Sequence, residues 1–198
     1  VTGWRTYVVN SRPGDPDRHW YGARPELYAD IRGEKAAALI PQIYQAVENY
    51  PYPTQYEAWP GPNSNTFVAW VIRETPDFDV ALPSHAIGKD YLGDRLIAPS
   101  PGGAGYQLSL GGYFGVLAGV REGLEVNILG LSLGINPMAL GIKLPGLGEL
   151  ALLDTNPELA QLRHQVQSLA NSRYRLAACF FSSWLFSNSS RNLSMIFR

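Results

Sequence analysis

Four small polar residues stand side by side at one point of this chain and could bind a ligand or take part in acyl chemistry. They are Asn63, Ser64, Asn65 and Thr66. Side chains of these types accept hydrogen bonds from the unpaired N–H groups of a first helical turn, and the same N–H groups attract anions or a developing oxyanion. The segment therefore predicts either a helix cap or a site, and both interpretations stay open.

The elements on either side decide how those four residues are presented. Residues 65–74 have apolar side chains at helical spacing and precede Pro76, so they predict a helix, and residues 55–59 predict a short strand. The four polar residues then occupy a strand-loop-helix junction. Trp59 and Trp70 flank this junction and are expected to wall a groove, although aromatic residues at such spacing also fill protein cores.

A second helix is predicted earlier in the chain. Residues 27–32 alternate as a strand does, and residues 33–49 carry Leu39, Ile43 and Ala46 at helical spacing. Pro41 has no N–H to donate and its ring clashes with the preceding turn. We therefore expect this helix to begin near residue 38 or to bend at Pro41.

The composition changes at residues 102–150, which are rich in Gly, Leu, Ile and Val. The runs 106–110, 113–120 and 124–133 predict strands of a small antiparallel sheet, with residues 121–123 as a hairpin tip. Such an apolar sheet is either buried on both faces or lies against a membrane or a partner. The expected fold class is α+β, an antiparallel sheet with two packed helices.

The length of 198 residues favours one domain, which we place at residues 1–153. Residues 154–198 are expected to form an amphipathic helix, with Leu159, Leu162 and Val166 on one side, and a poorly integrated apolar tail. The chain begins inside a strand-like stretch, so we expect an upstream segment in the natural protein. No run of about 20 apolar residues is present in the sequence.

Composition excludes several functional classes. The formal net charge is −1 without blocks of like charge, which argues against nucleic acid as a partner. The single cysteine, Cys179, excludes a cysteine-based zinc site. Asp15, Asp17 and His19 lie in a Pro-Gly turn and are expected to be solvated, as are Lys89 and Asp90, so no metal and no cofactor are predicted.

Several sequence blocks together resemble a bacterial family catalogued as domain of unknown function 3750. The resemblance covers about residues 3–150 and rests on eight ordered blocks: RPELYADIRG (24–33), ALIPQI (38–43), YPY (50–52), WPGPNSNTF (59–67), IGKDYL (87–92), LIAPS (96–100), EGLEVNILGL (122–131) and KLPG (143–146). It implies an upstream hydrophobic signal or anchor, followed by a strand with a His-Xaa-Trp motif. From this we expect location in the bacterial cell envelope or periplasm and association with a membrane.

The family is similar, more distantly, to the permuted papain-like proteins of the NlpC/P60 and lecithin retinol acyltransferase types. That resemblance implies a truncated permuted papain-like core, in which Ser64 stands where the relatives have a cysteine. A serine hydroxyl needs a positioned base before it can react, whereas a helix N-terminus alone can activate a thiol. No spacing pairs His19, His85 or His164 with Ser64, so the substitution argues against papain-like chemistry.

These observations predict an envelope-associated, non-catalytic binding or structural module with a papain-like groove. Residues 63–66 would offer hydrogen-bond donors to a carbonyl or carboxylate of an unknown small molecule, peptide or lipid. The alternative is a serine-based amidase or acyltransferase with Ser64 as nucleophile and an upstream histidine as base. A third option is that the apolar residues 102–150 dock on a lipid or protein partner, including peripheral contact with a membrane.

Overall fold

A computed structural model describes residues 26–153 and 192–197 of the chain. The expectations for residues 1–25, including the turn with Asp15, Asp17 and His19, lie outside the described residues, as does the amphipathic helix expected after residue 154. The chain divides into two compact units. Among the described residues, the first unit holds 42–153, and the second holds 26–41 and 192–197.

The second unit contains a two-stranded sheet. Strand β1 (Glu26–Arg32) pairs antiparallel with β9 (Asn192–Phe197), so that Glu26 lies opposite Phe197 and Arg32 opposite Asn192. The strand predicted at residues 27–32 is therefore present. The segment for which a tail was predicted, residues 154–198, contributes β9 to this pair.

Helix α1 (Gly33–Glu48) follows β1 directly, and the helix predicted there is confirmed. It begins at Gly33 rather than near residue 38, with Pro41 inside it. An interior proline costs a helix about 3 kcal/mol. Burial of one apolar face offsets this cost, because Leu39, Ile43 and Ala46 are each at most 3% exposed.

Helix α2 (Ser64–Arg73) matches the second predicted helix to within one residue. The strand predicted at residues 55–59 is absent, because residues 55–57 have no regular structure and residues 58–59 form a bend. Its backbone pairs locally, since the Glu57 N–H donates to the Pro62 carbonyl at 2.8 Å. The Trp59-Pro60 and Gly61-Pro62 peptide bonds are cis.

Seven antiparallel strands form the main sheet of the first unit, each paired with the next along the chain. They are β2 (Ile97–Pro99), β3 (Gly105–Leu110), β4 (Phe114–Gly119), β5 (Gly123–Ile128), β6 (Leu131–Asn136), β7 (Gly141–Leu144) and β8 (Gly148–Ala151). The predicted antiparallel sheet is confirmed. The predicted single run 124–133 is two strands, because Leu129 and Gly130 turn the chain with φ of 54° and 84°.

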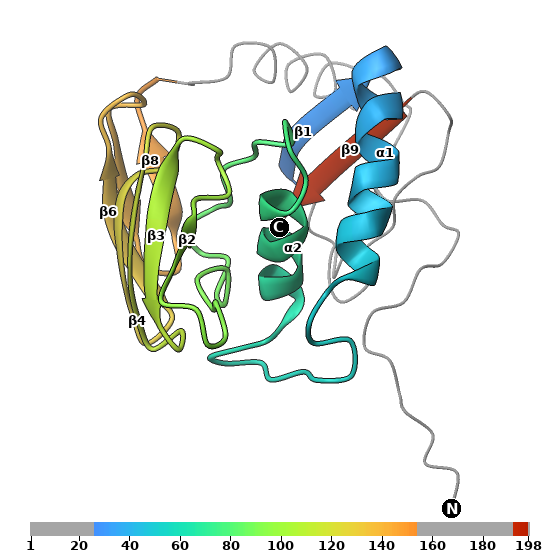
Figure 1. The fold of residues 1–198 in the computed structure, drawn as a ribbon. Coiled ribbons are helices and arrows are strands. Elements are labelled where there is room, and N and C mark those ends of the chain that lie inside the picture. Colours follow the sequence, from blue (N-terminus) through green and yellow to red (C-terminus); the bar gives the residue numbers. More distant parts are fainter. Residues whose placement is uncertain (1–25, 154–191, 198) are drawn as a thin grey trace, which may run out of the picture. The chain divides into compact units, whose positions relative to one another are not determined.

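The first unit is layered, with the sheet on one side and α2 on the other (Figure 1). The irregular segment 74–96 lies between them. Thr66 Oγ1 donates to the Gly88 carbonyl at 2.8 Å, and Lys89 Nζ lies 2.5 Å from Glu125 Oε2, so this segment bonds to both layers. The fold class is α+β, as expected.

Candidate functional site

Asn63 caps helix α2. Its Oδ1 accepts hydrogen bonds from the N–H groups of Asn65 at 2.9 Å and Thr66 at 3.1 Å. The Thr66 hydroxyl oxygen in turn accepts from the Asn63 N–H at 3.1 Å, which completes a capping box. Two of the first-turn N–H groups that a ligand was predicted to use are thus bonded to Asn63.

The same side chains fasten a distant loop to the helix. Asn63 Nδ2 donates to the carbonyls of Ala58 and Ile87, each at 3.0 Å, and Asn65 Nδ2 donates to Ile87 at 2.9 Å. Gly88 has φ of 92°, and a Cβ there would collide with the Asn63 amide. Glycine therefore permits the close approach that these hydrogen bonds require.

Ser64 is the first residue of α2 and is half-buried. Its hydroxyl makes no hydrogen bond to any residue in the described ranges, so no base is bonded to it there. The ring of His85 lies beside Gly148, where an added Cβ would be 3.1 Å from Nδ1. His19 and His164 lie outside the described residues.

Trp59 and Trp70 have different neighbours. Trp59 is 42% exposed and packs edge-on against Tyr113, with ring centroids 5.1 Å apart. The indole N–H of Trp70 donates to the Ala46 carbonyl at 3.0 Å, and the guanidinium of Arg95 lies 5.2 Å from the Trp70 ring centroid. Neither set of contacts tests the groove that the two tryptophans were predicted to wall.

The face of the main sheet that is turned toward segment 74–96, here called the inner face, carries buried charge. The ammonium nitrogens of Lys89 and Lys143 each lie 2.5 Å from one oxygen of Glu125, and all three side chains are 3% exposed. Burial alone would raise the pKa of Glu125, but the attraction of the two lysines outweighs it and lowers that pKa. This carboxylate is therefore held in its charged form inside the protein.

Arg73, at the end of α2, binds the same face. Its guanidinium donates to the carbonyls of Pro99 at 3.0 Å and Lys89 at 3.1 Å, and also to Gln107 Oε1. Burial, together with repulsion from Arg95, lowers the pKa of Arg73 to about 10. Arg73 thus connects the helix, the intervening segment and strand β3.

A small cavity lies on the inner face, lined by Asp90 and Gln107 among others, with room for about one water molecule. Asp90 Oδ2 and Gln107 Nε2 are both buried and have no hydrogen-bond partner. Burial raises the pKa of Asp90. Lys89 and Asp90 were predicted to be solvated, and this prediction is wrong, because their side chains are buried, with residues 2% and 4% exposed.

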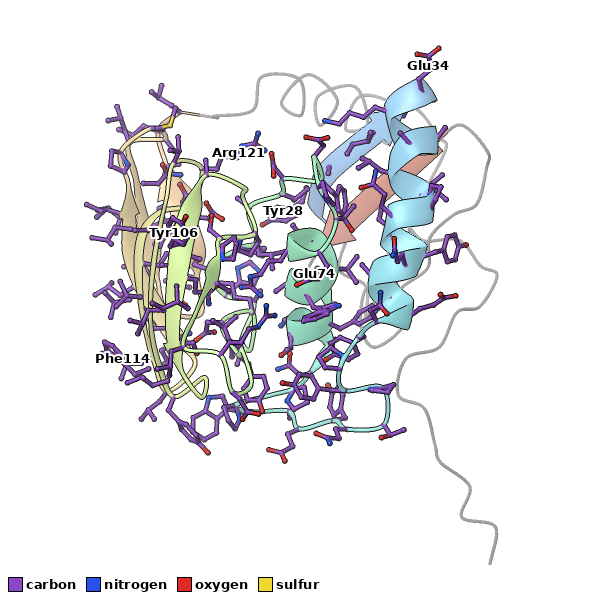
Figure 2. The ribbon with its side chains drawn as sticks, in the orientation of Figure 1. Tyr28, Glu34, Glu74, Tyr106, Phe114 and Arg121 are labelled. Atoms are coloured by element: carbon purple, nitrogen blue, oxygen red, sulfur yellow. The ribbon has the colours of Figure 1, made fainter. Side chains whose placement is uncertain are left out.

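The opposite face of the main sheet, here called the outer face, is apolar and exposed. Cross-strand partners share a face, so the registers define its members. Its exposed side chains are Ile97, Tyr106, Leu108, Leu110, Phe114, Leu124, Ile128, Leu131, Leu133, Ile135, Ile142 and Leu150. Figure 2 shows this surface as side chains of carbon that project from the sheet on the side away from α2, with Tyr106 and Phe114 labelled.

The apolar surface continues over both ends of the sheet. Leu129 and Leu147, in the turns at one end, are 61% and 74% exposed, and Met138 and Leu140, in a turn at the other end, are each 58% exposed. Arg121, in the turn between β4 and β5, is directed toward Asp79, whose carbonyl its guanidinium binds at 2.6 Å. The outer face and its turns are therefore exposed to solvent. On the described strands, no charged side chain lies on this face.

Two kinds of feature are missing from the described ranges 26–153 and 192–197. Neither helix there is long and apolar enough to cross a bilayer. No cluster of three His, Cys, Asp or Glu side chains in those ranges is arranged to hold a metal ion.

Comparison with known protein families gives one match. The family described as "Protein of unknown function (DUF3750)" matches residues 1–91, which include the capped start of α2 and the Lys89-Asp90 pair. The resemblance to this family is confirmed over those residues. No curated protein and no solved structure matches the chain.

Proposed function

We propose that this chain is a non-catalytic binding or structural module of the bacterial cell envelope, and that it binds through the outer face of its main sheet. The observation that carries the proposal is the exposure of an entire apolar sheet face. Contiguous apolar surface on this scale marks an interaction site in proteins that do not aggregate. The family match over residues 1–91 supports an uncharacterised domain.

The exposed outer face forgoes a large amount of burial energy. A leucine such as Leu131 or Leu133, 53% and 55% exposed, forgoes roughly 1 kcal/mol of burial energy. Summed over the outer face, the forgone energy is comparable with the roughly 5–15 kcal/mol that stabilises a whole domain. A partner that covers this face would recover a large part of it.

The outer face can be tested with charges placed where they disturb no buried contact. The variant Leu131→Asp with Leu133→Asp adds two negative charges to the face, and Thr54→Asp with Gln55→Asp adds the same charge at exposed loop positions. We expect the wild-type chain and the loop control to bind the neutral dye Nile red strongly and the face variant to bind it weakly. Equal dye binding by all three proteins would sink the proposal, since the face would then be covered or inaccessible.

The papain-like groove at residues 59–70 is proposed as a secondary ligand site. Ser64 supports it, because its hydroxyl is half-buried and not hydrogen-bonded to other described residues. A ligand carbonyl at the helix start would have to compete with Asn63 Oδ1 for the N–H groups of Asn65 and Thr66. That competition favours a weak site over a tight one.

A serine-based amidase or acyltransferase is the second candidate, favoured by the same half-buried Ser64 hydroxyl at a helix start. Its base would be a histidine upstream of this chain. Labelling of the full-length protein by a fluorophosphonate probe, abolished by Ser64→Ala and kept in Asn65→Ala, would establish the enzyme. The non-catalytic proposal predicts that the probe labels neither the full-length wild-type protein nor its Asn65→Ala variant.

The envelope location follows from the family resemblance and is tested separately. We expect full-length protein in its bacterial host to fractionate with membranes or periplasm. Recovery in the cytosolic fraction alone would remove the envelope from the proposal and leave the binding face in place.

A further inference from the structure

We infer that the occupant of the outer face is the hydrocarbon of an uncharged or zwitterionic lipid surface, an inference that rests on the proposed binding role of this face. The outer face offers few groups for hydrogen bonding. Protein interfaces carry about one hydrogen bond per 100–200 Å² and are about two-thirds apolar even at their cores. The exposed side chains of the outer face offer a single polar group, the Tyr106 hydroxyl, so the face matches hydrocarbon better than it matches a protein.

The backbone of the sheet is compatible with an apolar medium. Strands β3 to β7 each pair with a neighbouring strand on both sides, so the N–H and C=O groups within those pairings are satisfied inside the sheet. Only the edge strands, β2 and β8, keep one unpaired side. A sheet whose outer face lies flat on a lipid surface can turn these edges toward the headgroups, which avoids unpaired polar groups in hydrocarbon.

The extent of the apolar surface separates a lipid from a second copy of the chain. Two flat sheet faces packed together would bury the outer face about 10 Å apart but leave the turns beyond it uncovered. Leu129, Leu147 and Met138 in those turns are as exposed as the face itself. A fluid layer covers face and turns together, and therefore accounts for both.

Amphipathic aromatic residues stand at the ends of the face. Tyr113 is 51% exposed in the turn between β3 and β4, and Trp59 packs on it. Tyr106 is 70% exposed near the opposite end of β3. Tyrosine and tryptophan favour the boundary between hydrocarbon and headgroups, so these positions suit the rim of a surface lying on a bilayer.

Charge defines which lipids fit. Basic side chains of the main sheet are directed elsewhere, because Lys143 is buried on Glu125 and Arg121 binds the Asp79 carbonyl. Attraction to anionic lipid requires basic residues near the surface. Binding should therefore need neither anionic lipid nor low salt.

The test is flotation of the full chain with phosphatidylcholine vesicles, with and without anionic phosphatidylserine, at low and at high salt. We expect flotation in all four conditions. The Leu131→Asp, Leu133→Asp variant should partition at least about tenfold less, whereas the Thr54→Asp, Gln55→Asp control partitions as the wild type does. Circular dichroism should show that both variants are folded, since neither changes a buried residue.

Three other outcomes would overturn the inference that an uncharged or zwitterionic lipid surface covers the outer face. Flotation that requires phosphatidylserine and disappears in high salt would show electrostatic binding. Absence of flotation, with a dimer in sedimentation that the face variant dissociates, would assign the face to a second copy and leave the binding module standing. Absence of flotation, of self-association and of Nile red binding would remove both the lipid and the proposed function.

Discussion

Glu125 Oε1 lies 2.5 Å from the ammonium nitrogen of Lys143 in the middle of the inner face, where both side chains are 3% exposed. Lys89 reaches the other oxygen of the same carboxylate from segment 74–96. The lysines come from different parts of the fold, so a single glutamate fixes the position of the irregular segment on the sheet. Breaking one member of such a buried group leaves the others uncompensated.

The first prediction concerns Glu125→Gln. Removing the carboxylate leaves two buried ammonium groups facing a neutral amide, and we expect the free energy of unfolding to fall by about 3–5 kcal/mol. Urea denaturation measures this. Glu149→Gln is the matched control, because Glu149 is 3.7 Å from Lys143 and its side chain is 29% exposed, and it should cost less than about 1 kcal/mol. Equal losses in the two variants would show that the buried arrangement adds nothing.

The second prediction concerns the pH dependence that Glu125 imposes. Its pKa in the folded protein lies below the ordinary 4.5, since the lysine attraction exceeds the effect of burial. The stabilisation is therefore complete above pH 4.5 and is lost as the pH falls through the folded pKa. Urea titrations between pH 7 and pH 3 should show a steeper loss in the wild type than in Glu125→Gln, and parallel curves would contradict the assignment.

The third prediction concerns Asp90, for which the sign is reversed. Burial raises its pKa above the ordinary 3.8, so its favourable contribution exists at low pH and disappears as the pH rises through the folded pKa. At pH 7 the buried carboxylate is charged at a cost in free energy, which Asp90→Asn removes. We therefore expect this variant to be more stable than the wild type by about 1 kcal/mol at pH 7 and equally stable at pH 3. The exposed Asp94→Asn serves as control and should change neither value. Destabilisation by Asp90→Asn at pH 7 would mean that the charged carboxylate is needed in the cavity.

The fourth prediction concerns the cap. Asn63→Ala removes the acceptor for two helix N–H groups and the donor for the Ala58 and Ile87 carbonyls, so we expect a loss of about 2–3 kcal/mol. Asn65→Ala removes one exposed bond and should cost about 1 kcal/mol or less. Hydrogen exchange would report the site directly, because the Asn65 and Thr66 amides should exchange faster in Asn63→Ala alone. Unchanged exchange there would refute the capping role.

Local sequence signals were enough for the helices and for the type of sheet. A polar cluster after a Gly-Pro turn located the start of α2 to within one residue, and apolar runs with glycine turns predicted antiparallel strands. The strand predicted at residues 55–59 failed because its backbone pairs within its own loop, through the Glu57 to Pro62 hydrogen bond. The break at Leu129 and Gly130 was missed because the one turn residue there, Gly130, stands between leucines in a continuous apolar run, and a leucine seldom adopts the positive φ that Leu129 has.

The inner face could not be found by local reasoning, since its contacts join residues far apart in the chain. Lys89 and Glu125 are 36 positions apart, and nothing near Lys89 in the sequence indicates its burial. One signal was available: polar residues alternate with leucine, valine or isoleucine in QLSL (107–110) and EVNI (125–128). Alternation of this kind predicts a sheet with one polar and one apolar face, but not that the polar face is the buried one.

The main sheet has its hydrocarbon on one side and its ion pairs on the other, which is the reverse of most half-exposed sheets. Detergents should therefore bind the outer face of these seven strands, whereas acid, which protonates Glu125, should act on the inner face. A mild non-ionic detergent can coat the leucine side without competing for Glu125 or Arg73, so purification in micelles should preserve the native state.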